Sequence, residues 1–251
     1  MDTNPAERSV DRSITALVVN YRTAELTRRC VDSLLAQYPT VQLLVIDNNS
    51  ADESTAYVSG LATEHENVRV QLNDRNIYHG PALDQGLRLA QTPFVFTLDS
   101  DCEVFGSGFL EQMLSRFDDP LLYAVGELRY KNRFGYTYAN WDVDGRDRPA
   151  WIPYIHPYAM LLDRRKYLTL PPFIHHGAPC IKNMRAARRA GYVVRHFPVY
   201  EVVRHEHGGT SRAHGYGFWG RGRLTAGFYA GKVYDRLVGD RTWRVRYPPD
   251  R

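Results

Sequence analysis

Apolar residues in the first half of the chain form short continuous runs, and the segments between these runs have helical spacing. Runs rich in valine, leucine and isoleucine predict buried strands at 14–21, 41–50, 68–73 and 93–99. The intervening segments predict helices at 23–38, 52–62 and 80–91. Thr23 stands at a favourable helix cap, and Pro81 suits a first helical turn. Strands that alternate with helices in this way predict a parallel sheet in an α/β fold.

The second half of the chain has a less regular pattern. Two more helices are predicted at 106–117 and 184–192, and Gly191 closes the second of them. The segment 121–160 predicts strands with long loops, and 193–209 predicts a strand, a turn and a strand.

Polar residues stand at the ends of three predicted strands, namely Asn20, Asp47 and Asp99. Because ligands bind at the carboxyl ends of strands in open α/β sheets, we expect these residues to share one cleft. The stretch FVFTLDSDCEV adds Asp101 two residues after Asp99. Carboxylates this close repel each other unless a cation or a ligand lies among them, and Mg²⁺ and Mn²⁺ bind such oxygens. The plainer interpretation is a solvated acidic turn that caps the helix predicted at 106.

Composition narrows the class of protein. Of 251 residues, 43% are hydrophobic and 24% are charged, which is typical of a globular domain. A net charge of +4 suits an anionic ligand but gives no case for nucleic acid. Three separate cysteines without CxxC spacing argue against zinc and disulfides, and they favour a cytoplasmic location. The N-terminus lacks a signal peptide and no run approaches the roughly 18 apolar residues of a membrane span, so no transmembrane segment is expected.

Four motifs in order resemble family 2 glycosyltransferases of the GT-A fold. They are VVNYRTAEL, VIDNNSADES, NIYHGPALDQG followed by FTLDSD, and VRHEHGGTS, and together they extend over most of the chain. The resemblance implies a Rossmann-like three-layer αβα sandwich with a mostly parallel central sheet. It also implies a division of the chain into a flexible tail, a nucleotide-sugar-binding half, an acceptor-binding half and a basic, aromatic extension, at 1–13, 14–103, 104–215 and 216–251.

The resemblance also implies roles for individual residues. Donor-binding residues would be Asn20, Tyr21, Glu25, Asp47, Asn49, Asn76, Asp84 and Asp99. Among these, Asn20 and Tyr21 would lie beside the base, Asp47 would bind the base or ribose, and Asp99 would bind the ribose or the diphosphate side. Asp101 would ligate Mn²⁺ or Mg²⁺. His205 would be a further contact to the metal or diphosphate, with His207 as its rival.

The chain departs from the family pattern at two places. Tyr78 stands where glycine is usual, and Asp84 stands where asparagine is usual. Near the helix that ends in Gly-Tyr, Pro179 and Cys180 replace the acids that normally include the catalytic base, and no carboxylate occurs between Asp163 and Glu201.

Histidine can act as a base at neutral pH, so it is the first substitute for the missing acid. The candidate bases are His175 and His176, with Asp142 and Asp144 as rivals on the acceptor side. Structural roles for both histidines, and a metal-assisted retaining mechanism without a dedicated base, remain open at this point. An inverting reaction with a non-standard base is the main expectation.

The predicted function is transfer of a sugar from a nucleotide diphosphate sugar, with a UDP-sugar as the expected donor. The acceptor would be a hydroxyl-bearing small metabolite or glycan, and the aromatic segment 130–145 could line its groove. A homodimer is a further candidate assembly. The alternatives are a sugar-phosphate nucleotidyltransferase, although no glycine-rich phosphate loop follows the first strand, and a non-catalytic relative that has lost its base. A dinucleotide oxidoreductase is disfavoured because its GxGxxG motif is absent.

Overall fold

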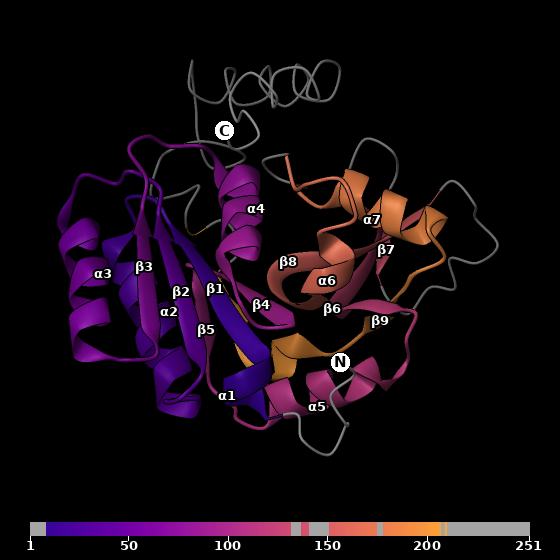
Figure 1. The fold of residues 1–251 in the computed structure, drawn as a ribbon, viewed down its shortest axis with the longest axis horizontal. Coiled ribbons are helices and arrows are strands. Elements are labelled where there is room, and N and C mark those ends of the chain that lie inside the picture. The colour runs from indigo at the N-terminus through magenta and orange to yellow at the C-terminus, as the bar shows by residue number, and fades with distance from the viewer. Residues whose placement is uncertain (1–8, 132–136, 141–150, 175–177, 207–208, 210–251) are drawn as a thin grey trace.

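A computed structural model describes residues 9–131, 137–140, 151–174, 178–206 and 209. In this part of the chain, eight strands form one sheet in the order β3-β2-β1-β4-β8-β6-β7, and β9 pairs with β6 (Figure 1). The strands are β1 (Ile14–Asn20), β2 (Gln42–Asp47), β3 (Val68–Leu72), β4 (Phe94–Asp99), β6 (Leu122–Lys131), β7 (Thr137–Asn140), β8 (Ile152–Asp163) and β9 (Val193–His196).

The sheet is mostly parallel, as predicted. Strands β1 to β4 are parallel to one another, and the register places Asn20 opposite Asp47 and Val19 opposite Asp99. Strand β8 is antiparallel to both β4 and β6, so β6 and its parallel partner β9 run in the same direction as the first four strands. Among the described strands of this sheet, only β7 and β8 run in the opposite direction.

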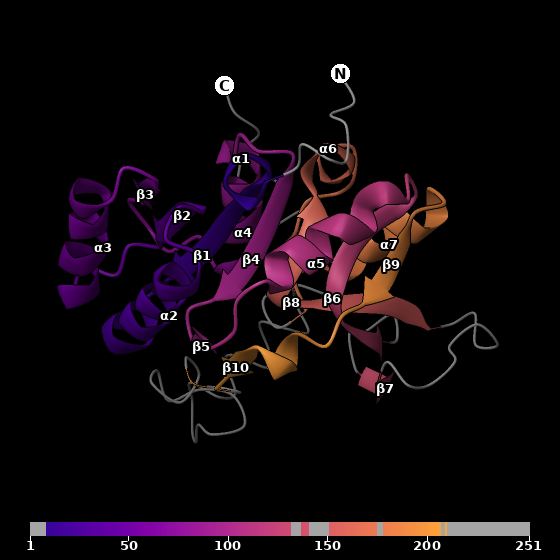
Figure 2. The same ribbon diagram turned by 90° about the horizontal axis from the view of Figure 1, so that it is seen from below.

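Helices cover both faces of the sheet. The helices are α1 (Val10–Ser13), α2 (Ala24–Gln37), α3 (Glu53–Glu64), α4 (His79–Leu89), α5 (Phe109–Ser115), α6 (Arg164–Tyr167) and α7 (Ile181–Arg189). Alternate residues of β1 divide the core, since Ala16 and Val18 pack with α2, α3 and α5, whereas Leu17 and Val19 pack with α4 and α7. Figure 2 shows α2 and α5 on one side of the sheet and α4 on the other. The predicted three-layer αβα fold is therefore confirmed.

The predicted strands and helices of the first half are confirmed to within a few residues. Gly191 follows α7 with φ of 85°, as expected for a glycine after a helix end. The tail predicted for residues 1–13 does not extend over α1, because Val10 is 6% exposed and packs in the core. None of the helices that the structure describes is both long enough and apolar enough to cross a membrane.

A small second sheet projects from the main one. Strand β5 (Cys102–Val104) pairs antiparallel with β10 (Val203–His205), so that His205 lies opposite Cys102. The two 3₁₀ helices are η2 (Arg116–Asp118) and η3 (Val199–Glu201), and η3 leads into β10. This pairing brings a segment from late in the chain to the end of β4, where Asp99 and Asp101 lie.

The contact between α4 and β1 allows a test of the fold. A Cβ atom on Gly86 would lie 2.3 Å from Cδ1 and 3.0 Å from Cγ of Leu17, which is fully buried. Overpacking of this kind costs about 1–3 kcal/mol and outweighs the better helix propensity of alanine. We expect Gly86→Ala to lower the free energy of unfolding by about 1–2 kcal/mol, measured by urea denaturation.

Gly60→Ala is the matched control, because a Cβ on Gly60 of α3 would meet only Oε1 of Glu64, at 3.8 Å. This change should raise the free energy of unfolding by about 0.5–1 kcal/mol. Equal effects of the two substitutions would contradict the described contact of α4 with β1.

Candidate active site

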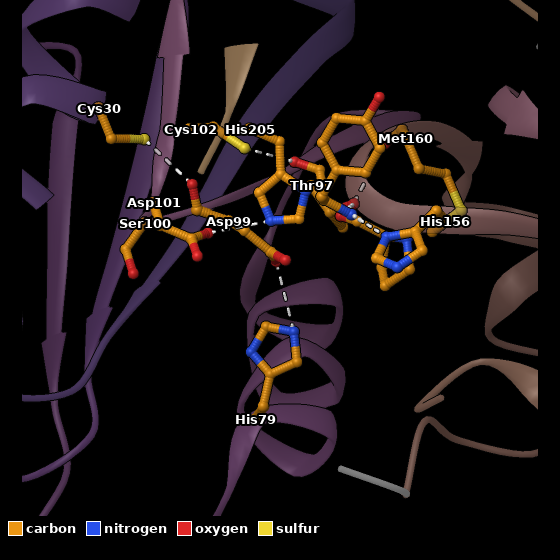
Figure 3. Close-up of polar contacts among 12 residues, drawn as sticks. Cys30, His79, Thr97, Asp99, Ser100, Asp101, Cys102, His156, Met160 and His205 are labelled. Carbon is orange, nitrogen blue, oxygen red and sulfur yellow. Dashed lines mark hydrogen bonds and ion pairs between the residues drawn. The ribbon is translucent and has the colours of Figure 1, made fainter. Parts of the chain in front are cut away.

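The turn after β4 places two carboxylates beside an imidazole. Asp99 ends β4, and Asp101 lies in the turn before β5. Because β10 pairs with β5, Nε2 of His205 lies 3.2 Å from Oδ1 of Asp101, and Figure 3 shows the two side chains facing each other. Gly209 lies so close that a Cβ there would be 3.0 Å from Cβ of Asp101. His205 and Gly209 of the late segment therefore both lie beside the DSD turn.

Burial and mutual charge control the protonation of these groups. The side chains of Asp101 and His205 are 7% and 11% exposed. Burial raises the pKa of Asp99; the imidazole of His79 opposes this shift, and the charge of Asp101 adds to it. Burial alone would lower the pKa of His205, but the hydrogen bond with Asp101 and the charges of Asp99 and Asp101 raise it above its usual value. The carboxylates of the turn thus favour the protonated form of His205.

The donor atoms at this turn suit a divalent cation. Asp101, Cys102 and His205 each offer one atom, and these atoms lie within 4.8 Å of one another. The Cys102 thiol donates to the carbonyl of Tyr158 at 3.6 Å, and burial raises its pKa far above the ordinary value, so it stays protonated. A carboxylate oxygen and an imidazole nitrogen are ligands that Mn²⁺ and Mg²⁺ sites accept. The residues that fit the ion are therefore Asp101 and His205.

His79 is a residue of the site that sequence reasoning missed. It is the first residue of α4, and its Nε2 lies 3.4 Å from Oδ1 of Asp99 (Figure 3). That oxygen is buried and has no hydrogen bond within the described part of the chain. An imidazole at this place is therefore the group that faces the inner oxygen of Asp99. The signal was present in the motif NIYHG, where His79 follows the position of the usual glycine.

Asn20 has a structural role in this conformation. Its Nδ2 donates to Asp47 at 2.6 Å, Ser50 at 3.0 Å and Ser54 at 2.8 Å. Its Oδ1 accepts from Thr23 at 3.1 Å and Thr27 at 2.7 Å. The side chain is fully buried. In this conformation its amide joins β1, α2 and α3, and the contact of Asn20 with the base stays a prediction.

Asp47 belongs to the same buried network. Its Oδ1 accepts from Asn20 and from the hydroxyl of Ser50, and its Oδ2 accepts from the backbone of Ser50 and from Thr55. With 2% exposure, the carboxylate shapes the loop after β2 and presents no free oxygen to a base or ribose in this conformation. Its place at the strand end agrees with the sequence, and its contact with a ligand stays a prediction.

Asp84 lies away from the strand ends. It is fully buried on α4, where its Oδ1 accepts from the hydroxyl of Tyr167 at 2.5 Å and its Oδ2 accepts from Nε of Arg88 at 3.0 Å. The carboxylate thus ties α4 to α6. In this conformation both oxygens face these structural partners, and the role of Asp84 in donor binding stays a prediction.

The remaining predicted donor residues lie around the carboxyl edge. Tyr21 is half-buried beneath the guanidinium of Arg22, and Oδ1 of Asn76 accepts from Asn48 at 2.9 Å. Glu25, in the first turn of α2, and Asn49, with φ of 62°, are exposed. Their contacts with a donor stay predictions.

The predicted residues His175, His176, Asp142, Asp144 and His207 lie outside the described residues, as does most of the aromatic segment 130–145.

Comparison with known proteins identifies the family to which the chain belongs. The model of "Glycosyl transferase family 2" matches residues 15–186, which is more than half of the chain. The chain belongs to glycosyl transferase family 2. Among curated proteins, the succinoglycan biosynthesis protein ExoO of Rhizobium meliloti (strain 1021) is 33% identical over 116 residues, or 46% of this chain and 32% of that protein.

Solved structures confirm the fold of this family 2 member. The mannosyltransferase PcManGT from Pyrobaculum calidifontis, solved with GDP-Man and Mn²⁺, aligns with a TM-score of 0.58 and 18% identity, over 78% of this chain and 56% of that one. GalNAc-T7, solved with UDP, GalNAc and Mn²⁺, aligns with a TM-score of 0.60 and 13% identity, over 74% and 42%. The chain thus spans about a third of the length of ExoO and about half of the length of the two solved chains.

Tyr78 explains one departure from the family motif. It precedes α4 with φ of 70° and ψ of 165°, a backbone region that is almost restricted to glycine. Glycine is the residue that the family resemblance leads us to expect at this position. Tyr78 directly precedes His79. The backbone strain therefore lies in the turn that directs His79 toward Asp99.

Substitutions at Tyr78 test this strain. A non-glycine residue in this region costs about 1–3 kcal/mol. We expect Tyr78→Gly to have a free energy of unfolding about 1–2 kcal/mol higher than Tyr78→Ala, since both lack the ring and only glycine relieves the backbone. Chemical denaturation measures the difference, and equal stability of the two variants would show that this turn is unstrained.

Proposed function

We propose that this family 2 member transfers a sugar from a nucleotide diphosphate sugar to a hydroxyl group of an acceptor. The observation that carries the proposal is the contact of buried Asp101 with His205, whose side chain is 11% exposed, at the end of β4 beside Asp99. Parallel α/β sheets bind ligands at this edge. Nucleotides are present in the solved structures of PcManGT and GalNAc-T7, which share the fold.

A divalent cation is part of the proposed chemistry. Asp101 and His205 would hold Mn²⁺ or Mg²⁺, and both solved relatives contain Mn²⁺. When bound, the ion acts as a Lewis acid that stabilises the negative charge of the diphosphate leaving group. Asp99 accepts hydrogen bonds from the ribose side of the nucleotide sugar. His79 orients the carboxylate of Asp99. UDP is the nucleotide that we expect, as the sequence motifs imply.

The acceptor proton requires a base from elsewhere in the chain. Cys180 occupies the family position of the acid just before α7, but it is fully buried, and burial raises its pKa far above the ordinary value. It therefore does not serve as a base. His175 and His176 remain the proposed bases, with Asp142 as the rival, and an inverting displacement is the proposed stereochemistry.

Binding of UDP with Mn²⁺ tests the proposed donor site. We expect UDP with Mn²⁺, at about 100 times its Kd, to add roughly 2.7 kcal/mol of stability, which raises the melting temperature by about 5–10 °C. Asp101→Asn should abolish this increment because the carboxylate ligand is lost. Differential scanning fluorimetry with UDP, GDP and other nucleotides, with and without Mn²⁺, measures both effects.

Glu103→Gln is the matched control for Asp101→Asn. Glu103 lies two residues further along, and its carboxylate pairs with Arg204 across β5 and β10. Its substitution should leave the increment from UDP and Mn²⁺ intact. An unchanged increment in Asp101→Asn would remove Asp101 from the site, and no increment in the wild-type chain with any nucleotide would contradict donor binding.

A further inference from the structure

A pocket adjoins the proposed metal site on the side of β10. It has a volume of about 530 Å³, and its lining includes Phe105, Glu127, Arg129, Tyr158, Tyr200 and His205. This volume lies in the range of small-molecule sites and is large enough for one or two sugar rings. None of its lining residues except His205 was predicted to belong to a site.

Two aromatic rings at this pocket are unusually exposed. Phe105, just after β5, is 55% exposed, and Tyr200 of η3 is 45% exposed. Leaving such rings in water is unfavourable unless a ligand covers them. The C–H groups on one face of a pyranose form an apolar surface that packs on an aromatic ring. Rings from two different elements at one pocket therefore suit a saccharide.

The pocket also contains a rigid polar pair. Nε and Nη2 of Arg129 lie 3.0 Å from Oε1 and Oε2 of Glu127, respectively, and both residues belong to β6. Their side chains are only 22% and 15% exposed, so they are held in place. The two parallel hydrogen bonds place the carboxylate acceptor of Glu127 beside the guanidinium donors of Arg129. Neighbouring hydroxyl groups of a sugar, each both donor and acceptor, match such a pair.

Charge in the pocket favours a neutral sugar over an anionic one. Arg129 is balanced by Glu127, and Arg204 is balanced by Glu103. The ion pairs therefore use the positive charge that would otherwise attract a phosphate or a carboxylate.

One aromatic side chain connects the pocket to the proposed metal site. The ring of Tyr158 stacks on His205 with centroids 4.6 Å apart and an interplanar angle of 6°. His205 in turn faces Asp101 at 3.2 Å. Tyr158 and Glu127 line the same pocket, and the charge of Glu127 adds to burial in raising the pKa of the Tyr158 phenol. The side chain of Tyr158 therefore lies between a sugar bound at Glu127 and the place where the diphosphate would bind.

We propose that this pocket binds a neutral hexopyranose unit of the acceptor, with Phe105 and Tyr200 against its faces and Glu127 and Arg129 on its hydroxyl groups. The assignment rests on the proposed glycosyl transfer and names the acceptor class as a saccharide. It places the acceptor against β6, η3 and β10.

Saturation-transfer NMR on the full chain with UDP and Mn²⁺ tests the pocket, with the methyl glycosides of glucose, galactose and mannose as probes. We expect saturation transfer to at least one glycoside, and at least a fivefold loss of that signal in both Phe105→Ala and Tyr200→Ala. Phe105→Tyr should keep the signal because it keeps a ring. Leu121→Ala, at another position that is 51% exposed, is the control that should change nothing.

The outcomes separate this proposal from the proposed function. If UDP and Mn²⁺ stabilise the wild-type chain but no glycoside receives saturation, or the signal survives both alanine substitutions, the saccharide pocket is wrong and donor binding stands. If the nucleotides fail to stabilise the chain while the glycoside signal still depends on both rings, the pocket is supported and the donor proposal fails. A signal from glucuronate alone, used as an anionic probe, would contradict the neutral class.

Discussion

The site depends on the like charges of Asp99 and Asp101, which a buried strand end holds close together. Carboxylates in such a place are stable only when donors or cations face them. The chain supplies two imidazoles, with His205 on Asp101 at 3.2 Å and His79 on Asp99 at 3.4 Å. They come from opposite sides, one through the pairing of β10 with β5 and the other through the start of α4. Each connection therefore places one imidazole against one of the two carboxylates.

A second layer of polar contacts keeps the edge of the sheet in register. Asn20 joins the end of β1 to Asp47 of β2 and to the helices that follow both strands. Since buried polar groups are costly unless they are fully paired, this network favours one arrangement of the loops. The strained Tyr78 lies in the adjacent loop. A rigid network beside a strained turn is a suitable support for a site that must place two carboxylates accurately.

Much of the fold follows from local pattern, whereas the roles of polar residues do not. The strands that end at Asn20, Asp47 and Asp99 were predictable because parallel strands are continuous apolar runs. A polar residue at a strand end, however, can face a ligand or pair with its own loops, and Asn20 and Asp47 do the latter. Asp84 faces α6, and only the packing of two helices decides that direction. The pocket at Glu127 depends on a register shift between β6 and β8, which no local pattern reveals.

The central claim is that Asp101 and His205 together hold the cation that receives the diphosphate. Electron spin-echo envelope modulation of Mn²⁺ bound with UDP tests it directly, since one coordinated imidazole gives a ¹⁴N signal. The account predicts that this signal is present in the wild-type chain and in His79→Gln, and that it is lost in His205→Gln. A nitrogen signal that survives His205→Gln, or bound Mn²⁺ with no nitrogen signal, would contradict the account.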